Sequence, residues 1–344
     1  MVVDTKNLDA IREDGKIRRA IEKTNHTTHS RGLFMKFNAL RDFLTVAERG
    51  SLRAAARQMG SAQAAISHSI HELERELGVA LFERTSKGVT LTPMGVVFSR
   101  RATSILGDVR RAREEIDQLR GAEQGTLSIA MSSVPHIALL PGVLRPFRTR
   151  FRDLKMDIID ALYPRVQSRL LDGSLDFYIG PVPGDTAAGL QVEKLFNNTR
   201  TIVARKGHPL AHARSLKELV NAEWITSTVT YTAEEELGPL FEQHGLPPPR
   251  LVMSSHSTLT FLTSMVHSDL LMVLPVQWTQ SPLLTMVQEI RVKEELPAPP
   301  ICIVTRSAMP LTPAADYFCD LIRREVHHLQ KDSGGKSAAT ALQA

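Results

Sequence analysis

Apolar residues recur every three or four positions in three consecutive stretches near the amino end, residues 37–47, 52–59 and 65–77. This spacing places apolar side chains on one face of a helix, so each stretch predicts a short amphipathic helix. Gly50 and Gly60 separate the stretches, and each is followed by a serine that can cap the next helix. Two short helices joined by so tight a turn cross steeply, which is helix-turn-helix geometry.

A β-hairpin is predicted beyond the third helix. Gly78 ends the helical spacing, and residues 81–91 then alternate apolar and polar positions around a turn. Arg84 and Lys87 stand at this turn, where two cations can lie beside the DNA backbone. Residues 36–92 are therefore predicted to form a winged helix-turn-helix DNA-binding domain.

The third predicted helix carries the candidate base-contacting residues. Gln63, Ser67, His68 and His71 share the face opposite the apolar stripe, around the turns that would enter a major groove. Glutamine can pair with adenine, serine with donor or acceptor edges, and histidine with guanine acceptors or a phosphate. The alternative is a solvated polar face without a binding role.

Phosphate contacts are predicted at the start of the second helix and in the wing. Arg53, Arg84 and Lys87 are the candidate phosphate anchors, and Ser51 is a further candidate DNA contact. The net charge of +5 permits nucleic-acid binding without showing it, because many proteins are mildly basic.

A heptad pattern follows the hairpin. Thr92-Pro93 opens a long helix over residues 93–121, and its apolar positions alternate in steps of four and three. These positions are Phe98, Ala102, Ile105, Val109, Ala112, Ile116 and Leu119. The seam could pack on its own domain, but next to a DNA-binding head it favours a dimer that spaces two heads for two half-sites.

From residue 126 onward, short apolar runs alternate with helical stretches, which predicts an α/β domain with parallel strands. The predicted strands are residues 127–131, 156–160, 177–180, 201–205, 251–254, 270–274 and 301–305. Residues 1–35 fit no pattern and are interpreted as a disordered extension or a mis-annotated start. The Ser-, Gly- and Ala-rich tail, residues 330–344, is predicted to be disordered.

A set of distinct short motifs occurs, each at a characteristic spacing, over about residues 36 to 328. In the head they are Ser51-Leu52-x-x-Ala55-Ala56, Ala65-Ile66-Ser67, Ile70-x-x-Leu73-Glu74, Leu77-Gly78, Leu81-Phe82-x-Arg84, Gly88-x-x-Leu91-Thr92 and Gly95. In the carboxyl half they are Leu171-x-Gly173-x-Leu175-Asp176-x-x-Ile179, Gly207-His208-Pro209-Leu210-Ala211 and Leu274-Pro275. This set resembles the LysR-type transcriptional regulators.

The resemblance implies a fold and partners. It implies an effector-binding domain, residues 126–329, with two lobes of the periplasmic-binding-protein type joined by two crossover strands. Lobe I would contain residues 126–196 and 300–329, and lobe II residues 197–299. The implied partners are promoter DNA, RNA polymerase, a small-molecule effector in the cleft, and further copies of the chain in a dimer or tetramer.

Two departures from the family pattern affect the third helix. Where relatives usually carry Ser-Gln-Pro-Ala, this chain has Ala62-Gln63-Ala64-Ala65, which leaves Ser61 as the candidate cap. His68 and His71 stand where arginines are common, so fixed positive charge is missing from the DNA face. We therefore predict weaker and more pH-sensitive DNA binding than in an arginine-bearing relative.

Hydroxyl-bearing residues follow several predicted strands, where α/β folds bind ligands. Ser132 and Ser133 follow the first strand and precede a helix, where hydroxyls and free amides favour an organic anion. The second-lobe candidates are Thr226, Thr228, Ser255, His256 and Ser257. The alternative role for each Ser or Thr before a helix is a cap. Phe261 could face an aromatic effector, although its helical spacing favours a core position.

The segment from Arg113 to Gly121 resembles family members that control the use of aromatic sulfonates and aminobenzoyl-glutamate. This resemblance suggests an aromatic acid, carboxylate or sulfonate, as the effector. A solute-binding protein for small acids without a DNA role is the alternative, because one fold serves both sensors and carriers.

Composition and chemistry exclude other classes. No apolar run approaches the roughly 18 residues of a membrane span, and the polar first 35 residues hold no secretory signal, so we expect a cytoplasmic location. Cys302 and Cys319 lack CxxC or histidine spacing and are predicted to be buried thiols. No nucleophile with a base, carboxylate pair or metal-ligand set stands out, so neither an enzyme nor a cofactor is predicted.

Overall fold

The computed structural model of the chain describes residues 35–85, 88–182, 184, 186–227, 233–255, 257–281, 285–307 and 309–341. These residues fall into two compact units, one ending at Ser99 and the other beginning at Arg100. No helix among the described residues is long and apolar enough to cross a membrane.

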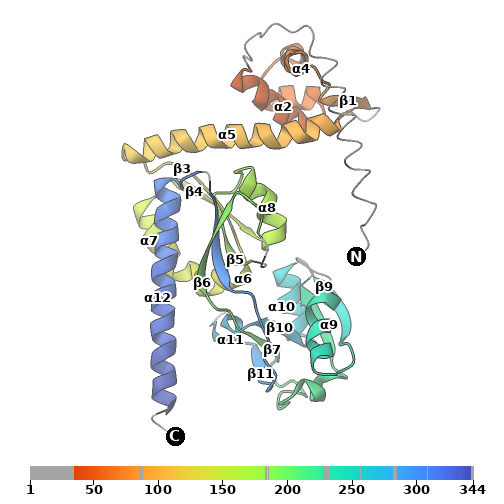
Figure 1. Cartoon of the computed structure of the whole chain (residues 1–344), viewed down its shortest axis with the longest axis vertical. Coiled ribbons are helices and arrows are strands. Elements are labelled where there is room, and N and C mark those ends of the chain that lie inside the picture. The colour runs from red at the N-terminus through yellow and green to blue at the C-terminus, as the bar shows by residue number, and fades with distance from the viewer. Residues whose placement is uncertain are drawn as a thin grey trace, which may run out of the picture. The chain divides into compact units, whose positions relative to one another are not determined.

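The first unit contains the three predicted short helices, α2 (Phe37–Arg49), α3 (Leu52–Gln58) and α4 (Gln63–Leu77) (Figure 1). Gly50 ends α2 in the left-handed region at a φ of 61°, and the Ser51 hydroxyl then caps α3 by accepting the Ala54 N–H at 3.4 Å. The apolar faces of the three helices meet in a core of Leu40, Phe43, Val46, Ala55, Ala56, Ile66, Ile70 and Leu73.

The start of α4 differs from the prediction. Its N-cap residue is Ala62, which makes no side-chain capping hydrogen bond, so Ser61 does not cap this helix. The Ser61 N–H instead donates to the Ala56 carbonyl at 3.0 Å, which closes the turn after α3.

The wing is an antiparallel hairpin of β1 (Phe82–Thr85) and β2 (Gly88–Leu91). Glu74 of α4 fastens it to the helices, because its Oε1 accepts the N–H groups of Leu81 at 2.8 Å and Phe82 at 3.2 Å. The Phe82 ring also lies 5.1 Å from the ring of Phe43. The wing is therefore held by both hydrogen bonds and core packing.

Helix α5 (Pro93–Leu119) runs from the first unit into the second. Thr92 caps it by accepting the Gly95 N–H at 2.9 Å. At its start the predicted seam is already covered, since Phe98 packs on Phe43 at 5.0 Å and Ala102 is fully buried. The remaining seam positions, Ile105, Val109, Ala112, Ile116 and Leu119, are exposed.

Lobe I of the second unit is built on a five-stranded sheet in the order β4-β3-β5-β12-β6. Its strands are β3 (Gly125–Met131), β4 (Leu154–Asp160), β5 (Phe177–Pro181), β6 (Leu190–Phe196) and β12 (Ile301–Arg306). The first three are parallel, as predicted, but β12, which was also among the predicted strands, runs antiparallel to β5 and β6. A strand that returns from the other lobe enters this sheet from the opposite end.

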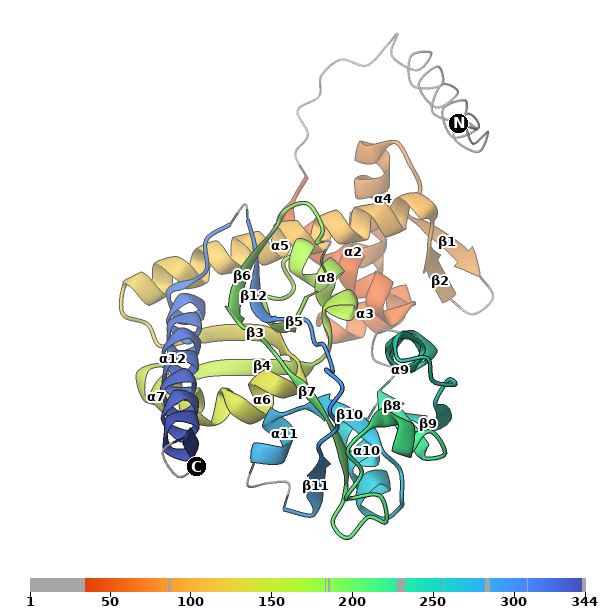
Figure 2. The same ribbon diagram turned by 60° about the horizontal axis from the view of Figure 1, so that its bottom comes forward.

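Helices cover both faces of this sheet. Helices α7 (Leu140–Arg150) and α12 (Pro313–Ala341) lie side by side in both ribbon views and pack on Phe177 and Ile179 of β5 (Figures 1 and 2). Helix α8 (Tyr163–Leu171) packs on the other face against Tyr178. Because side chains alternate along a strand, one strand supplies both cores.

Helix α12 continues to Ala341, so the tail predicted to be disordered from residue 330 is helical over most of its length. A helix that is already packed adds a hydrogen bond for each further residue without a new nucleation step, and here it continues even through Gly334 and Gly335, which are poor helix formers. The local composition alone did not include this effect.

Lobe II contains two small sheets. Strand β7 (Arg200–Arg205) lies between β10 (Met272–Pro275) and β11 (Val287–Ile290), and β8 (Glu223–Ser227) pairs in parallel with β9 (Arg250–Ser255). Their cores centre on Trp224 with Phe241 and on Phe261 with Met265. The helical elements of lobe II are α9 (Ala233–Gln243), α10 (Thr258–Val266), α11 (Gln277–Gln280) and the 3₁₀ turn η1 (Leu216–Leu219). Lobe I contains one further short helix, α6 (Ser133–Ala138).

Two chain segments join the lobes, one between β6 and β7 and one between β11 and β12. They meet in an antiparallel bridge between Thr199 and Pro297. The junction therefore brings residues distant in the sequence to the edge shared by both lobes.

Candidate functional sites

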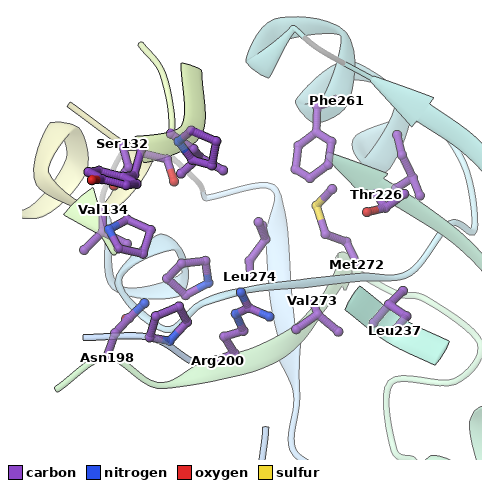
Figure 3. A pocket seen from close by; sticks show the side chains of 18 residues that line it. Ser132, Val134, Asn198, Arg200, Thr226, Leu237, Phe261, Met272, Val273 and Leu274 are labelled. Atoms are coloured by element: carbon purple, nitrogen blue, oxygen red, sulfur yellow. The ribbon is translucent and has the colours of Figure 1, made fainter. Parts of the chain in front are cut away.

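A cavity of about 180 Å³ lies where the two lobes meet, and we call it the first cavity. Figure 3 shows Ser132, Val134 and Asn198 on one side and Thr226, Met272 and Phe261 on the other, with Arg200 between the two groups. Most of the remaining wall is apolar, from Leu162, Ile225, Leu237 and Leu274 among others. A few polar groups on an apolar wall are typical of small-molecule sites.

Ser132 follows β3 and is the N-cap residue of α6, but its side chain makes no capping hydrogen bond. The residue is 2% exposed, and its Oγ has no hydrogen-bond partner among the described residues. A buried hydroxyl left in this state costs about 1–3 kcal/mol. The neighbouring Ser133 differs, because its Oγ accepts from the Trp278 Nε1–H at 3.3 Å.

Two polar residues of the first cavity were missed in the sequence. Asn198 lies in the segment between β6 and β7, is 8% exposed, and its Oδ1 also has no partner among the described residues. Arg200 begins β7 and points its guanidinium into the cavity (Figure 3). A guanidinium and a hydroxyl that line the same cavity suit a carboxylate or sulfonate, whereas the Asn198 Oδ1 would need a donor from the ligand.

The predicted lobe II residues divide into three groups. Thr226, at the end of β8, is 5% exposed and lines the first cavity. Ser255 and Ser257 line a neighbouring cavity of about 110 Å³, which we call the second cavity. Thr228 and His256 lie outside the described residues.

Ser255 and Ser257 hold local structure. The Ser255 Oγ accepts the Ser257 N–H and donates to the Ser257 carbonyl, both at 3.1 Å. The Ser257 Oγ accepts the Thr260 N–H at 3.3 Å and caps α10, which is the alternative role stated for it. Phe261 is a core residue and also lines both cavities, with its ring 6.3 Å from that of Trp278.

The candidate DNA-contacting residues of α4 are accessible. Gln63, His68 and His71 are exposed, while Ser67 is half-buried. The His71 Nδ1 lies 3.6 Å from Oε2 of Glu74, the residue that fastens the wing. This contact lies at the junction between α4 and the wing.

The other candidate DNA-contacting residues of the head lie in different elements, and not all of them are described. Arg53 is exposed on α3, and the Ser51 hydroxyl is used as the cap of that helix. Arg84 lies in β1, and Lys87 lies outside the described residues.

A charged cluster anchors α5 within the second unit. Arg111 is 6% exposed and donates to the Gly173 carbonyl and, at 2.5 Å, to Asp108 Oδ1. Arg306 of β12 also donates to Asp108. Partial burial alone raises the pKa of Asp108, but the hydrogen bonds from Arg306 and Arg111 outweigh it and hold the pKa below its usual range. Gln118 adds a bond to the N–H of Ala314 at 2.9 Å.

The remaining buried titratable groups fit structural roles. Cys302 and Cys319 are free thiols, and burial raises the pKa of both, which disfavours the reactive thiolate. Burial also raises the pKa of Asp176, whose carboxylate accepts the Ser128 N–H at 2.8 Å. No cluster of three metal-ligating side chains occurs in the part of the chain that the structure describes.

A winged head, a long connecting helix and a two-lobed domain with a cavity at the lobe junction define a DNA-binding regulator with a small-molecule-binding domain. Residues 37–96 match the model of the bacterial regulatory helix-turn-helix proteins of the lysR family, and residues 120–327 match that of the LysR substrate binding domain. The chain belongs to the LysR family of transcriptional regulators. These regulators are not enzymes, and the match confirms both the fold class and the resemblance inferred from the motifs.

Individual relatives agree with this assignment. The transcriptional regulator GbpR of Azospirillum brasilense is 29% identical over 239 residues, which cover 68% of this chain and 70% of GbpR. The regulator TdcA of Escherichia coli K12 is 26% identical over 282 residues, or 82% of this chain and 90% of TdcA. The crystal structure of CbnR, a LysR family regulator, gives a TM-score of 0.62 at 22% identity over 85% of this chain and 99% of CbnR.

Proposed function

We propose that this regulator binds promoter DNA through α4 and the wing, as a dimer or tetramer, and that a small organic anion between the lobes changes its effect on transcription. The observation that supports the effector site most directly is the buried Ser132 hydroxyl, which has no hydrogen-bond partner among the described residues and lines, with Arg200, a cavity formed by both lobes. A ligand oxygen could accept the Ser132 hydroxyl, and the positive charge of Arg200 in the same cavity would favour an anion.

The apolar walls support an aromatic acid as the effector. Leu162, Ile225, Phe261 and Leu274 line the first cavity, so the body of the ligand would be apolar while its anionic group meets Arg200. A carrier without a DNA role would not need the winged head. The effector can shift the equilibrium between regulatory states only by its difference in affinity for them.

Replacing Ser132 with alanine tests the effector site. Because the hydroxyl has no partner among the described residues, we expect the free energy of unfolding to rise by about 1 kcal/mol rather than fall. The affinity for a bound aromatic carboxylate or sulfonate should fall about tenfold, since one hydrogen bond to a charged group is lost. Thermal-shift titration with a panel of such acids measures both effects.

Ser264→Ala is the matched control for this substitution. The Ser264 hydroxyl donates to the Thr260 carbonyl at 2.8 Å and lines neither cavity, so acid binding should not change. Equal acid affinity in wild type and Ser132→Ala would contradict the placement of the anionic group.

The DNA-binding role is tested by footprinting promoter fragments, including the one upstream of the chain's own gene, with the wild type and His68→Ala. We expect wild-type affinity to increase as pH falls through the range in which histidine titrates, because protonated histidines add positive charge to the exposed face of α4. His68→Ala should weaken specific binding several-fold, by about 1 kcal/mol, and reduce the pH dependence.

His328→Ala provides the control, since His328 is exposed on α12 of the other unit. A wild-type affinity that is constant across this pH range would remove the proposed role of the α4 histidines. Absence of any preference for a promoter fragment over random duplex would overturn the DNA-binding proposal itself.

A further inference from the structure

The first cavity does not end at Phe261. The second cavity adjoins it, and the two share Ser133, Leu162, Phe261 and Leu274 as wall residues. The two cavities are therefore adjacent, with Phe261 in the wall of both, and a ligand that extends past Phe261 would meet groups of both.

The two parts differ in chemistry. The first has Arg200 and mainly apolar walls, whereas the second has Asp160 and Arg165 from lobe I facing Ser255, Ser257 and Thr258 from lobe II. The hydroxyls of Ser255 and Ser257 are already used in the turn and cap before α10. Asp160 is the carboxylate of the second cavity and therefore its strongest hydrogen-bond acceptor.

Asp160 is exposed at the end of β4, and its Oδ2 accepts the Thr258 hydroxyl of lobe II at 3.0 Å. An ionised carboxylate only accepts hydrogen bonds and has room for about four. A neutral hydroxyl is a weaker donor than an ammonium group, and charge-assisted bonds are roughly twice as strong as neutral ones. Asp160 can thus take a ligand donor in addition to Thr258 or in its place.

We propose that the second cavity binds a hydrogen-bond-donating end of the effector, an ammonium or a hydroxyl, through Asp160. The inference rests on the proposed anionic group in the first cavity and specifies the ligand further: an acid that carries a donor at its opposite end. Since Thr258 and Asp160 belong to different lobes, a donor that replaces Thr258 also removes one of the hydrogen bonds across the cleft.

The test is isothermal titration of the full-length protein with acids that differ at one end. The probes are benzoate, 4-hydroxybenzoate and 4-(aminomethyl)benzoate, with 3-phenylpropanoate and 3-(4-hydroxyphenyl)propanoate as a longer pair. We expect at least one donor-bearing acid to bind about tenfold more tightly than its plain partner. Comparison of the hydroxyl-bearing and ammonium-bearing acids shows which of the two donors binds Asp160 more tightly.

Asp160→Asn should reduce that preference to within about twofold while leaving the affinity for the plain acids unchanged. Thr258→Val should strengthen binding of the donor-bearing acid several-fold, because the competing hydroxyl is gone, an effect that a purely structural role of Thr258 would not give. Asp157→Asn is the matched control, since Asp157 is exposed on the same strand and lines neither cavity.

The outcomes separate the two proposals. Plain acids that bind as tightly as donor-bearing ones, or a preference that persists in Asp160→Asn, would overturn the second cavity as a donor site and leave the anionic effector intact. Failure of every acid to bind would overturn the anionic effector site, and this inference with it.

Discussion

Arg111→Ala is expected to lower the free energy of unfolding of the second unit by about 3 kcal/mol. The guanidinium is buried and donates to both the Gly173 carbonyl and Asp108, so its removal leaves a backbone acceptor and a carboxylate without these bonds. Arg306 alone would then hold Asp108. Urea denaturation followed by circular dichroism measures the loss.

Arg113→Ala is the matched control, because this arginine is two positions away on the same helix. Its side chain is 86% exposed and lies 3.8 Å from Asp117, so its removal should cost less than about 0.5 kcal/mol. If Arg111→Ala and Arg113→Ala unfold at the same urea concentration, the Arg111 cluster does not anchor α5.

Because of Asp108, the stability that this cluster contributes depends on pH. Its pKa is lowered in the folded state, so its contribution is present above the unfolded pKa and is lost as pH falls through the folded value. Wild type should therefore lose stability on acidification below about pH 4. Asp108→Asn should lack this part of the loss.

The head could be predicted closely because its signals are local. The spacing of Phe43, Ile66 and Leu73 identifies helix faces, and Gly50 marks a turn from its neighbours alone. Strand β6 was missed because it is an edge strand with four consecutive exposed residues, so its sequence lacks a clear apolar alternation.

The candidate effector site was predicted only in part, for a similar reason. Ser132 follows a strand in the sequence, and that position suggested it. Asn198, Arg200 and Asp160 reach the cleft because the segment between β6 and β7 crosses from one lobe to the other and β4 ends at the lobe junction. These are facts of topology rather than of local pattern. An arginine at the start of an apolar strand was the one available signal for Arg200.

The predicted apolar seam of α5 is covered at its start and exposed over the rest of its length. Phe98 and Ala102 are covered within the chain, as the single-domain alternative expected, whereas Val109, Ile116 and Leu119 are 46%, 58% and 73% exposed. An apolar face of this kind on one helix is costly in water and favours a second copy as its partner.

The double substitution Val109→Glu with Ile116→Glu is expected to convert the proposed dimer to a monomer and to weaken promoter binding about 100-fold or more. Four glutamates would face one another across the paired helices, and a single head loses the high effective concentration that a linked second head provides. Sedimentation velocity measures the association state, and titration of a two-half-site promoter fragment measures the affinity.

Val252→Glu is the control for the added charge, because Val252 is 44% exposed on β9 and lies outside the seam. It should sediment and bind DNA like the wild type. The affinity of the double variant for a single half-site should also stay within about twofold of wild type, since the head is unchanged. A double variant that still sediments as a dimer would show that other surfaces hold the copies together and that the α5 seam is not the main interface.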